Sequence, residues 1–237
     1  MNLIILHEED FITPDTVRIL GRRFEHIVSV LKAREGDTVK TGLLNGNTGA
    51  GEIISLAAGS ADIRVDLDCE PPLPIPLSLV IALPRPKILR RVIQCATVMG
   101  VKKIALIRTW KVEKSYWQSP FTCDESLAGE MELGLEQAGD TVLPVVKKYP
   151  LFRPFIEDEL EAFAAGTDRI LSHPGAAESC PVDIRRPATL AIGPEAGFTP
   201  YEIGMFEKAG FRTVGIGKRI LRVDQAVPAL ISRLFPG

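Results

Sequence analysis

The sequence predicts an α/β protein in which a small β-rich domain precedes a larger domain built on a mostly parallel sheet. Three observations lead to this fold class. Short strand-like segments fill the start of the chain, a proline-rich segment follows, and apolar strands then alternate with helices. Such alternation is typical of a parallel sheet covered on both faces. We expect domains at residues 1–70 and 77–237, joined by a linker at residues 71–76.

The first domain is expected to be a small β-barrel, because its apolar segments are short and are separated by turn residues. One helix is expected over about residues 22–32. Strands are expected at Leu3 to Leu6, Thr38 to Leu44, Glu52 to Leu56 and Ile63 to Leu67. The segment from Glu70 to Pro76 contains four prolines. Proline has no amide hydrogen, so this segment is predicted to be the linker rather than a central strand or a helix.

The second domain begins with a continuous apolar run, Leu77 to Leu83, which is typical of a strand buried on both faces. A helix from Lys87 to Met99 follows, with Lys87, Arg90 and Arg91 on its polar face. Another helix is expected from Asp124 to Gly139, and a third begins at Thr199 with proline and a capping-box glutamate, Glu202. Further strands are expected at Ile104 to Ile107, Val142 to Val146, Ile170 to Ser172, Leu190 to Ile192 and Val214 to Ile216.

The near-neutral composition conceals a strong charge asymmetry. The chain has 28 basic and 30 acidic residues. Residues 73–119, however, hold 9 basic and 1 acidic residue, and residues 208–237 hold 6 basic and 1 acidic residue. Residues 1–72 hold 7 basic and 12 acidic. The basic segments either form a surface for a polyanion or simply keep helix faces in water. Charge alone leaves both interpretations open.

The class and location of the protein follow from what the sequence lacks. It has no apolar stretch of the roughly 20 residues that a spanning helix needs. Its start, MNLIILHEED, is acidic where a secretory signal is basic, and the four cysteines form no CxxC pair. We therefore expect a cytoplasmic protein with reduced thiols and no membrane partner.

Common catalytic motifs are also missing from the sequence. It contains no GxGxxG, HExxH or GxSxG pattern, and the segment from Gly215 to Lys218 is no P-loop because Arg219 follows it. The three histidines are dispersed, so no metal site is expected. These absences argue against nucleotide, metal-dependent and serine hydrolysis. They leave a reaction that depends on positioning the substrates more than on reactive side chains.

Three glycine-containing loops leave predicted strands: Leu171 to Gly175, Ile192 to Phe198 and Ile216 to Asp224. Ligands of parallel α/β proteins bind at the carboxyl ends of strands, where glycine lets the backbone approach them closely. Each loop alone is more typical of an ordinary tight turn than of a binding site. The order and spacing of the three loops together are more specific for a ligand-binding site.

The segments Gly193-Pro194-Glu195-Ala196-Gly197-Phe198 and Gly217-Lys218-Arg219-Ile220-Leu221-Arg222 resemble the ending of the ribosomal RNA uridine-N3 methyltransferases, bacterial enzymes of the SPOUT or trefoil-knot class. The segment from Arg23 to Ile27 is similar to the PUA-like barrel with which that family begins. The resemblance covers essentially the whole chain.

This resemblance implies a knotted α/β domain, S-adenosylmethionine as cofactor, and a homodimer that acts on RNA of the small ribosomal subunit. The implied cofactor-binding residues are His173, Pro174, Ile192, Gly193, Pro194, Glu195, Gly197, Ile216, Gly217, Arg219, Ile220 and Leu221. The implied RNA-binding residues are Arg22, Arg23, Arg85, Lys87, Arg90, Arg91 and Lys114.

Methylation at uracil N3 requires loss of a proton and stabilisation of the resulting negative charge. Arg222 is the candidate cation, and Asp224 and Glu195 are candidate proton acceptors. The structural alternatives are a helix N-cap for Asp224 and a loop-holding contact for Glu195.

Several positions depart from the family pattern. They are Ala138-Gly139-Asp140, Ala196 in place of a glycine, Val223-Asp224-Gln225, and the acidic N-terminal region. Ala196 would loosen the pocket if its backbone required a positive φ. Two alternative functions therefore stay open: a SPOUT methyltransferase with another RNA target, and a non-catalytic RNA-binding or assembly protein that retains the fold.

Overall fold

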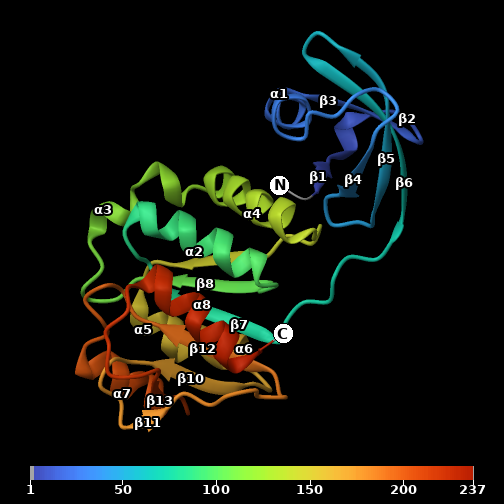
Figure 1. Ribbon diagram of the computed structural model, residues 1–237. Helices are drawn as coiled ribbons and strands as arrows, with labels where there is room; N and C mark the ends of the chain where they lie inside the picture. Colours follow the sequence, from blue (N-terminus) through green and yellow to red (C-terminus); the bar gives the residue numbers. More distant parts are fainter. Residues whose placement is uncertain (1–2, 237) are drawn as a thin grey trace. The chain divides into compact units, whose positions relative to one another are not determined.

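The computed structural model describes residues 3–236, which form two compact units (Figure 1). The first unit comprises the chain up to Leu73 together with Glu132–Leu143. The second unit comprises Pro74–Met131 and the chain from Pro144 onwards. Helix α4 (Asp124–Ala138) therefore contributes residues to both units.

The first unit is built on a six-stranded mixed sheet with the order β1-β4-β5-β6-β3-β2. Its strands are β1 (Ile4–Leu6), β2 (Phe11–Thr13), β3 (Thr16–Leu20), β4 (Thr38–Leu43), β5 (Thr48–Ala57) and β6 (Ser60–Cys69). β1 pairs parallel with β4, and the other pairs are antiparallel. Alternate residues of β6, such as Ile63 and Val65, turn into an apolar core that also contains Val17 and Ile19 of β3.

The first unit differs from the sequence expectation in two ways. Strands β2 and β3 were not expected, because each is short and is separated from the other by only Pro14 and Asp15. The helix predicted over residues 22–32 is α1 (Gly21–Glu25), which continues as a π-helical turn, His26–Val30. The four predicted strands are present, and β5 and β6 each extend to ten residues.

The second unit contains a seven-stranded sheet in which every pair is parallel, with the order β11-β13-β10-β12-β7-β8-β9. Its strands are β7 (Leu77–Ala82), β8 (Lys103–Ile107), β9 (Val145–Tyr149), β10 (Asp168–Ser172), β11 (Glu178–Ser179), β12 (Ala188–Ile192) and β13 (Arg212–Gly215). The α/β class with a parallel sheet is thus confirmed. The residues of β12 are all buried, as expected for a central strand covered on both faces.

One predicted strand of this sheet was placed too early. The expected strand at residues 142–146 is instead β9, which begins at Val145. Pro144 has no amide hydrogen to donate to a neighbouring strand. The amide of Val142 donates to Oδ1 of Asp140 at 2.9 Å, which folds residues 140–142 into a turn.

The helices of the second unit connect these strands. They are α2 (Pro86–Val98), α3 (Lys114–Trp117), α5 (Phe152–Pro154), α6 (Leu160–Phe163), α7 (Pro200–Lys208) and α8 (Val223–Leu234). Leu89, Val92 and Ile93 of α2 are fully buried, as their helical spacing predicted, and α2 packs against α8 (Figure 1). Within residues 3–236, no helix has the length and apolar character needed to cross a bilayer.

Candidate active site

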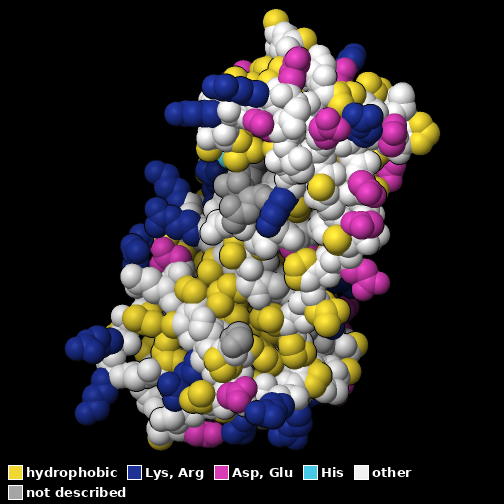
Figure 2. Space-filling model, turned by 45° about the vertical axis from the view of Figure 1, so that its right-hand side comes forward, with side chains coloured by type: hydrophobic (Ala, Val, Ile, Leu, Met, Phe, Trp, Pro, Cys, Tyr) yellow, Lys and Arg dark blue, Asp and Glu magenta, His cyan; other side chains and the backbone are white. Residues whose placement is uncertain are grey.

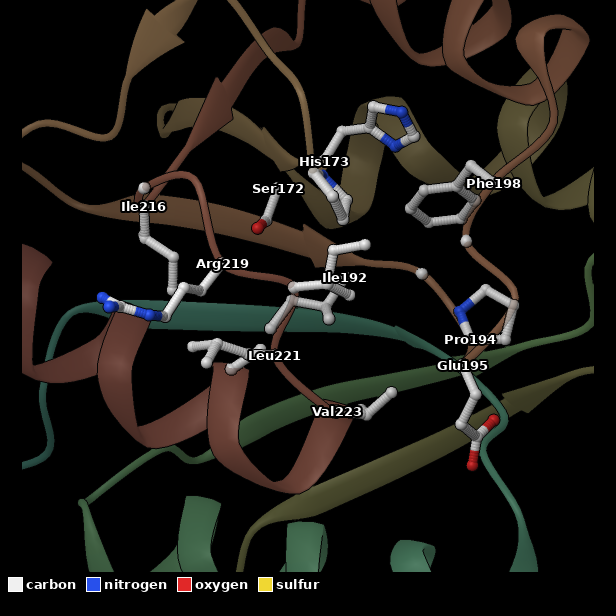
Figure 3. A pocket seen from close by; sticks show the side chains of 16 residues that line it. Ser172, His173, Ile192, Pro194, Glu195, Phe198, Ile216, Arg219, Leu221 and Val223 are labelled. Atoms are coloured by element: carbon white, nitrogen blue, oxygen red, sulfur yellow. The ribbon is translucent and has the colours of Figure 1, made fainter.

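A pocket lies at the carboxyl ends of β13, β10 and β12, which are neighbours in the parallel sheet. Three loops form most of it: residues 173–174 after β10, residues 193–198 after β12, and residues 216–221 before α8. The hollow encloses about 640 Å³ when space open to solvent is included. In Figure 3, His173 and Phe198 lie at one end of the labelled group and Ile216 and Arg219 at the other. This position, at the carboxyl ends of parallel strands, is where small organic ligands bind in α/β proteins.

The structure brings together all the residues that the family resemblance assigned to cofactor binding. The pocket lining includes His173, Pro174, Ile192, Gly193, Pro194, Glu195, Gly197, Ile216, Gly217, Arg219, Ile220 and Leu221. Four further lining residues were missed: Ser172, Phe198, Val223 and Ala226. Val223 and Ala226 are three positions apart in the first turn of α8, so their helical spacing could have indicated that they face the same side.

Two glycines shape the loop after β12. A Cβ atom on Gly193 would lie 3.1 Å from both Cδ2 and the backbone nitrogen of Phe198, so a side chain there would press on the loop itself. Gly197 has a φ of +68°, which glycine adopts without strain. Ala196, which departs from the family pattern, does not adopt a positive φ. The alanine is therefore accommodated without backbone strain.

His173 is a pocket-lining residue with a polar side-chain atom that the protein leaves without a partner. Its Nδ1 is buried and has no hydrogen-bond partner in the protein, although the residue lines the pocket. The His173 backbone amide donates to the carbonyl of Val214 at 2.9 Å, which fixes the loop after β10 to β13. Because a buried polar atom without a partner is costly, a ligand that completes this hydrogen bond would be favoured.

Three hydrogen bonds hold the loop after β12 and the helix that follows it. Oε1 of Glu195 accepts from the backbone amide of Arg85 at 3.0 Å, and Nζ of Lys111 donates to the carbonyl of Ala196 at 2.8 Å. Oε1 of Glu202 accepts from the backbone amide of Trp110 at 2.7 Å. These contacts tie the loop to the segments that follow β7 and β8. Figure 3 shows the Glu195 carboxylate pointing away from the other labelled side chains.

The predicted capping box at the start of α7 is confirmed. The hydroxyl of Thr199 accepts from the amide of Glu202 at 3.3 Å, and Oε2 of Glu202 accepts from the amide of Thr199 at 2.7 Å. Glu202 is 2% exposed, so its carboxylate is a buried group satisfied by these bonds and by the amide of Trp110.

Arg222 and Asp224 lie at the start of α8, beside the pocket-lining residue Val223. Oδ2 of Asp224 is 3.4 Å from Nη1 of Arg91 and 3.4 Å from Nη2 of Arg222. Its other oxygen, Oδ1, is buried and has no hydrogen-bond partner in the protein. The N-cap alternative for Asp224 is wrong, because the N-cap residue of α8 is Arg222 and Asp224 belongs to the first turn.

The residues expected to bind RNA fall in both units, and several of them are paired with acidic side chains. In the first unit, Arg22 and Arg23 form two-pronged ion pairs with Glu136 and Asp10, at shortest distances of 2.7 and 2.5 Å. The hydrogen bonds from Arg22 to Glu136 raise the pKa of the Arg22 guanidinium.

In the second unit, Arg90 is paired with Glu130 and Arg91 with Asp224, while Arg85, Lys87 and Lys114 are exposed. Figure 2 shows many Lys and Arg side chains projecting from this unit. Within the described part of the chain, no cluster of three or more His, Cys, Asp or Glu side chains could hold a metal ion. The candidate site is thus the pocket formed by the three loops, with Arg222 at the start of α8 beside it.

A parallel sheet with a loop-built pocket at its carboxyl edge places the protein among the α/β proteins that bind a small ligand there. The chain belongs to the RNA methyltransferase domain family, whose model matches residues 71–235. That match covers the whole pocket and every strand of the parallel sheet.

Relatives extend the similarity across both units. The chain is 33% identical to ribosomal RNA small subunit methyltransferase E of Treponema pallidum, over 97% of this chain and 88% of that protein. It is 27% identical to the protein of the same name in Synechocystis, over 92% of this chain and 72% of that protein. The structure is similar to that of the Neisseria gonorrhoeae protein of this name bound to S-adenosyl methionine, with a TM-score of 0.71. The two sequences are 21% identical, and the match covers 98% of this chain and 95% of that chain.

Proposed function

We propose that this protein transfers a methyl group from S-adenosylmethionine to N3 of a uridine in 16S ribosomal RNA. The observation that carries the proposal is the pocket, because the loops that form it are the segments with the family motif. The relatives named as methyltransferases of small-subunit ribosomal RNA support the choice of RNA, and the Neisseria structure bound to S-adenosyl methionine supports the cofactor.

The pocket residues fit this cofactor. Backbone groups of Gly193, Gly197, Ile216 and Leu221 would hold the adenine, with His173 and Pro174 beside it. The free, buried Nδ1 of His173 supplies a polar partner, and the lack of a side chain at Gly193 keeps the loop tight. S-adenosylmethionine provides an activated methyl group on a sulfonium centre, so the protein has to position the acceptor base and exclude water. We also propose that residues 77–237 form the trefoil knot that the family resemblance implies.

Arg222 and Asp224 are proposed to act on the acceptor base. Arg222 stabilises its developing negative charge, and Asp224 accepts its N3 proton. Uracil N3 carries a hydrogen in its neutral form, and the base becomes negative as this proton leaves. The guanidinium of Arg222, 63% exposed, is free to approach the base and stabilise that charge. Asp224 lies beside Arg222 in the first turn of α8, whereas the Glu195 carboxylate is turned to the Arg85 amide. We therefore assign the proton acceptor to Asp224.

The RNA is proposed to contact both parts of the chain. Exposed Arg85, Lys87 and Lys114 of the second unit would neutralise phosphates, together with Arg90 and Arg91. Residues 1–70 would act as a PUA-like RNA-binding domain joined by the linker at 71–76, with Arg22 half-exposed beside Glu136. Figure 2 shows hydrophobic side chains gathered on one face of the second unit, which supports a homodimer. A ribosomal substrate implies a cytoplasmic enzyme.

Calorimetric titration with S-adenosylmethionine and its demethylated product tests the cofactor site. We expect saturable binding to the wild type, and loss of binding in a folded Gly193→Trp variant, because the indole would displace Phe198 and fill the loop. Transfer of a labelled methyl group to unmodified small-subunit ribosomal RNA then tests the activity. Absence of cofactor binding at millimolar concentration would instead support a non-catalytic RNA-binding protein.

A further inference from the structure

An exposed tryptophan follows β8 in the second unit. The side chain of Trp110 is 86% exposed, although large aromatic rings are usually at least partly buried. Trp110 does not line the pocket after β10, β12 and β13, and the family motif does not include it. Its exposure is therefore not explained by the fold or by the cofactor site.

The backbone that carries this ring is held firmly. The Trp110 amide donates to Oε1 of Glu202 at 2.7 Å, and Glu202 is buried and fixed by the capping box of α7. The next residue, Lys111, donates from Nζ to the carbonyl of Ala196 at 2.8 Å. The first bond fixes the Trp110 segment to α7, and the second joins it to the pocket-forming loop, in which Ala196 lies.

The segment around the ring, residues 108–117, is rich in basic residues and has one acidic residue, Glu113. Lys111 and Lys114 are exposed in the same segment, Arg108 is partly exposed two residues before the ring, and α3 follows with Tyr116 and Trp117. Aromatic rings interleaved with basic side chains are typical of surfaces that bind single-stranded nucleic acid, where bases stack on the rings and cations meet the phosphates. An RNA strand matches both features of this segment.

We propose that Trp110 is a stacking platform that holds a base of the RNA beside the cofactor pocket. This inference rests on the proposed methylation of uridine N3. The N3 atom lies on the pairing edge of uracil, so the base must leave its pair and lose its stacking neighbours before it can react. The indole ring replaces that lost stacking, and because it contacts the face of a base it leaves the edge that carries N3 free.

Steady-state kinetics on unmodified small-subunit ribosomal RNA tests the role of the ring. Trp110→Ala should lower kcat/KM for RNA by roughly ten- to a hundredfold, while cofactor affinity stays unchanged. Trp110→Phe should recover most of the activity, because a ring remains for stacking. Leu151→Ala is the matched control, since Leu151 is also exposed, at 61%, in the second unit. Equal kcat/KM for Trp110→Ala and wild type would overturn the inference.

Fluorescence provides a readout that a purely structural role would not change. The chain contains two tryptophans, so Trp117→Phe leaves Trp110 as the sole indole emitter. A uridine-containing single-stranded RNA should quench its emission. A ribose-phosphate chain of equal length without bases should leave the emission unchanged, because it offers charge without stacking. Equal quenching by both strands, or by neither, would contradict stacking.

The two proposals fail in different ways. If the wild type methylates RNA and Trp110→Ala does so equally well, the stacking role is wrong and the proposed function stands. If RNA quenches the emission of the Trp117→Phe variant but the wild type methylates no uridine, the proposed function is wrong and Trp110 remains an RNA contact. A change of oligomeric state in Trp110→Ala, measured by sedimentation, would place the ring between two copies of the chain and overturn the inference.

Discussion

The carboxylate of Glu195 accepts a hydrogen bond from the backbone amide of Arg85, with 3.0 Å between the two atoms. Arg85 is the N-cap residue of α2, and Glu195 lies in the loop after β12. The bond joins segments that follow β7 and β12, which are adjacent in the sheet. A side chain of the pocket loop thus serves to hold the loop in place, which is the structural alternative considered for Glu195.

Substitution of Glu195 separates the holding role from catalysis. Glu195→Gln keeps an oxygen that can accept the Arg85 amide, so cofactor affinity and kcat should stay within about twofold of wild type. Glu195→Ala removes the acceptor and should weaken cofactor binding by about two- to tenfold, the effect of one hydrogen bond. Calorimetry and initial rates measure both effects. A Glu195→Gln variant that binds cofactor normally but has lost turnover would show that Glu195 takes the proton.

Arg222 and Asp224 should affect turnover rather than cofactor binding. Arg222→Ala should lower kcat by about a hundredfold, because a cation facing the developing negative charge is removed. Asp224→Asn should also lower kcat by about a hundredfold, and its rate should recover at a pH high enough for uracil itself to lose the N3 proton. Single-turnover rates over a range of pH measure this.

The matched control for Asp224→Asn is Asp158→Asn, the same chemical change at an exposed carboxylate of the second unit. It should leave the rate at every pH unchanged. An Asp224→Asn variant within twofold of wild type at neutral pH would remove Asp224 from the mechanism.

The acid sensitivity of the first unit should depend partly on Arg18 and Asp62, which lie opposite each other on β3 and β6. Arg18 donates to both carboxylate oxygens, at 2.8 and 2.9 Å, and these hydrogen bonds lower the pKa of Asp62. A carboxylate whose pKa is lowered by folding stabilises the folded state above its unfolded pKa of about 3.9, and this contribution is lost as the pH falls.

Arg18→Gln should therefore lower the urea midpoint of unfolding slightly at pH 7, where the pair is formed. The effect is small because the pair is half exposed on the Arg18 side. The difference between the two proteins should shrink as the pH falls below the unfolded pKa, and it should vanish only below the lowered pKa of Asp62 in the folded wild type, where the carboxyl group is protonated in both states. A difference that grows as the pH falls would mean that the pair does not act through the charge of Asp62.

Two glycine substitutions should have opposite effects on stability. A Cβ on Gly49 of β5 would lie 1.8 Å from the backbone oxygen of Asp66, at an irregularity in the pairing of β5 with β6. Gly49→Ala should thus destabilise the fold by about 1–3 kcal/mol. A Cβ on Gly129, inside α4, would instead enter open space. Gly129→Ala should stabilise by about 0.5–1 kcal/mol, since alanine favours the helix. Urea unfolding measures both, and a destabilised Gly129→Ala would contradict this expectation.

The central strands and the longer helices, such as α2 and α7, could be predicted from the sequence because their signals are strong and local. β7, β8 and β12 are apolar runs, and the Thr199 capping box marks the start of α7. Shorter elements could not be predicted. β11 has two residues, and β2 and β3 have too few residues for their alternation to stand out. The strand expected at 142 was misplaced because the Asp140 turn and Pro144 outweigh the β propensity of Val142.

The members of the pocket could be named from the family motif, but their contacts could not. The Glu195 bond joins residues 110 positions apart, and the bond that anchors Trp110 spans 92. Such long-range pairs depend on strand order, which local patterns do not specify. Phe198 was missed although it follows the motif glycine Gly197, because only the loop geometry shows its ring turned into the pocket.

Mass spectrometry of ribosomal RNA treated with the wild-type protein and S-adenosylmethionine tests the central claim most directly. The RNA is unmodified small-subunit RNA, supplied both naked and in the assembled subunit, and is digested to nucleosides after reaction. We expect one new product, uridine methylated at N3, which is absent when Gly193→Trp replaces the wild type. No methylated nucleoside from either substrate, or a methyl group at another atom or base, would contradict the proposed function.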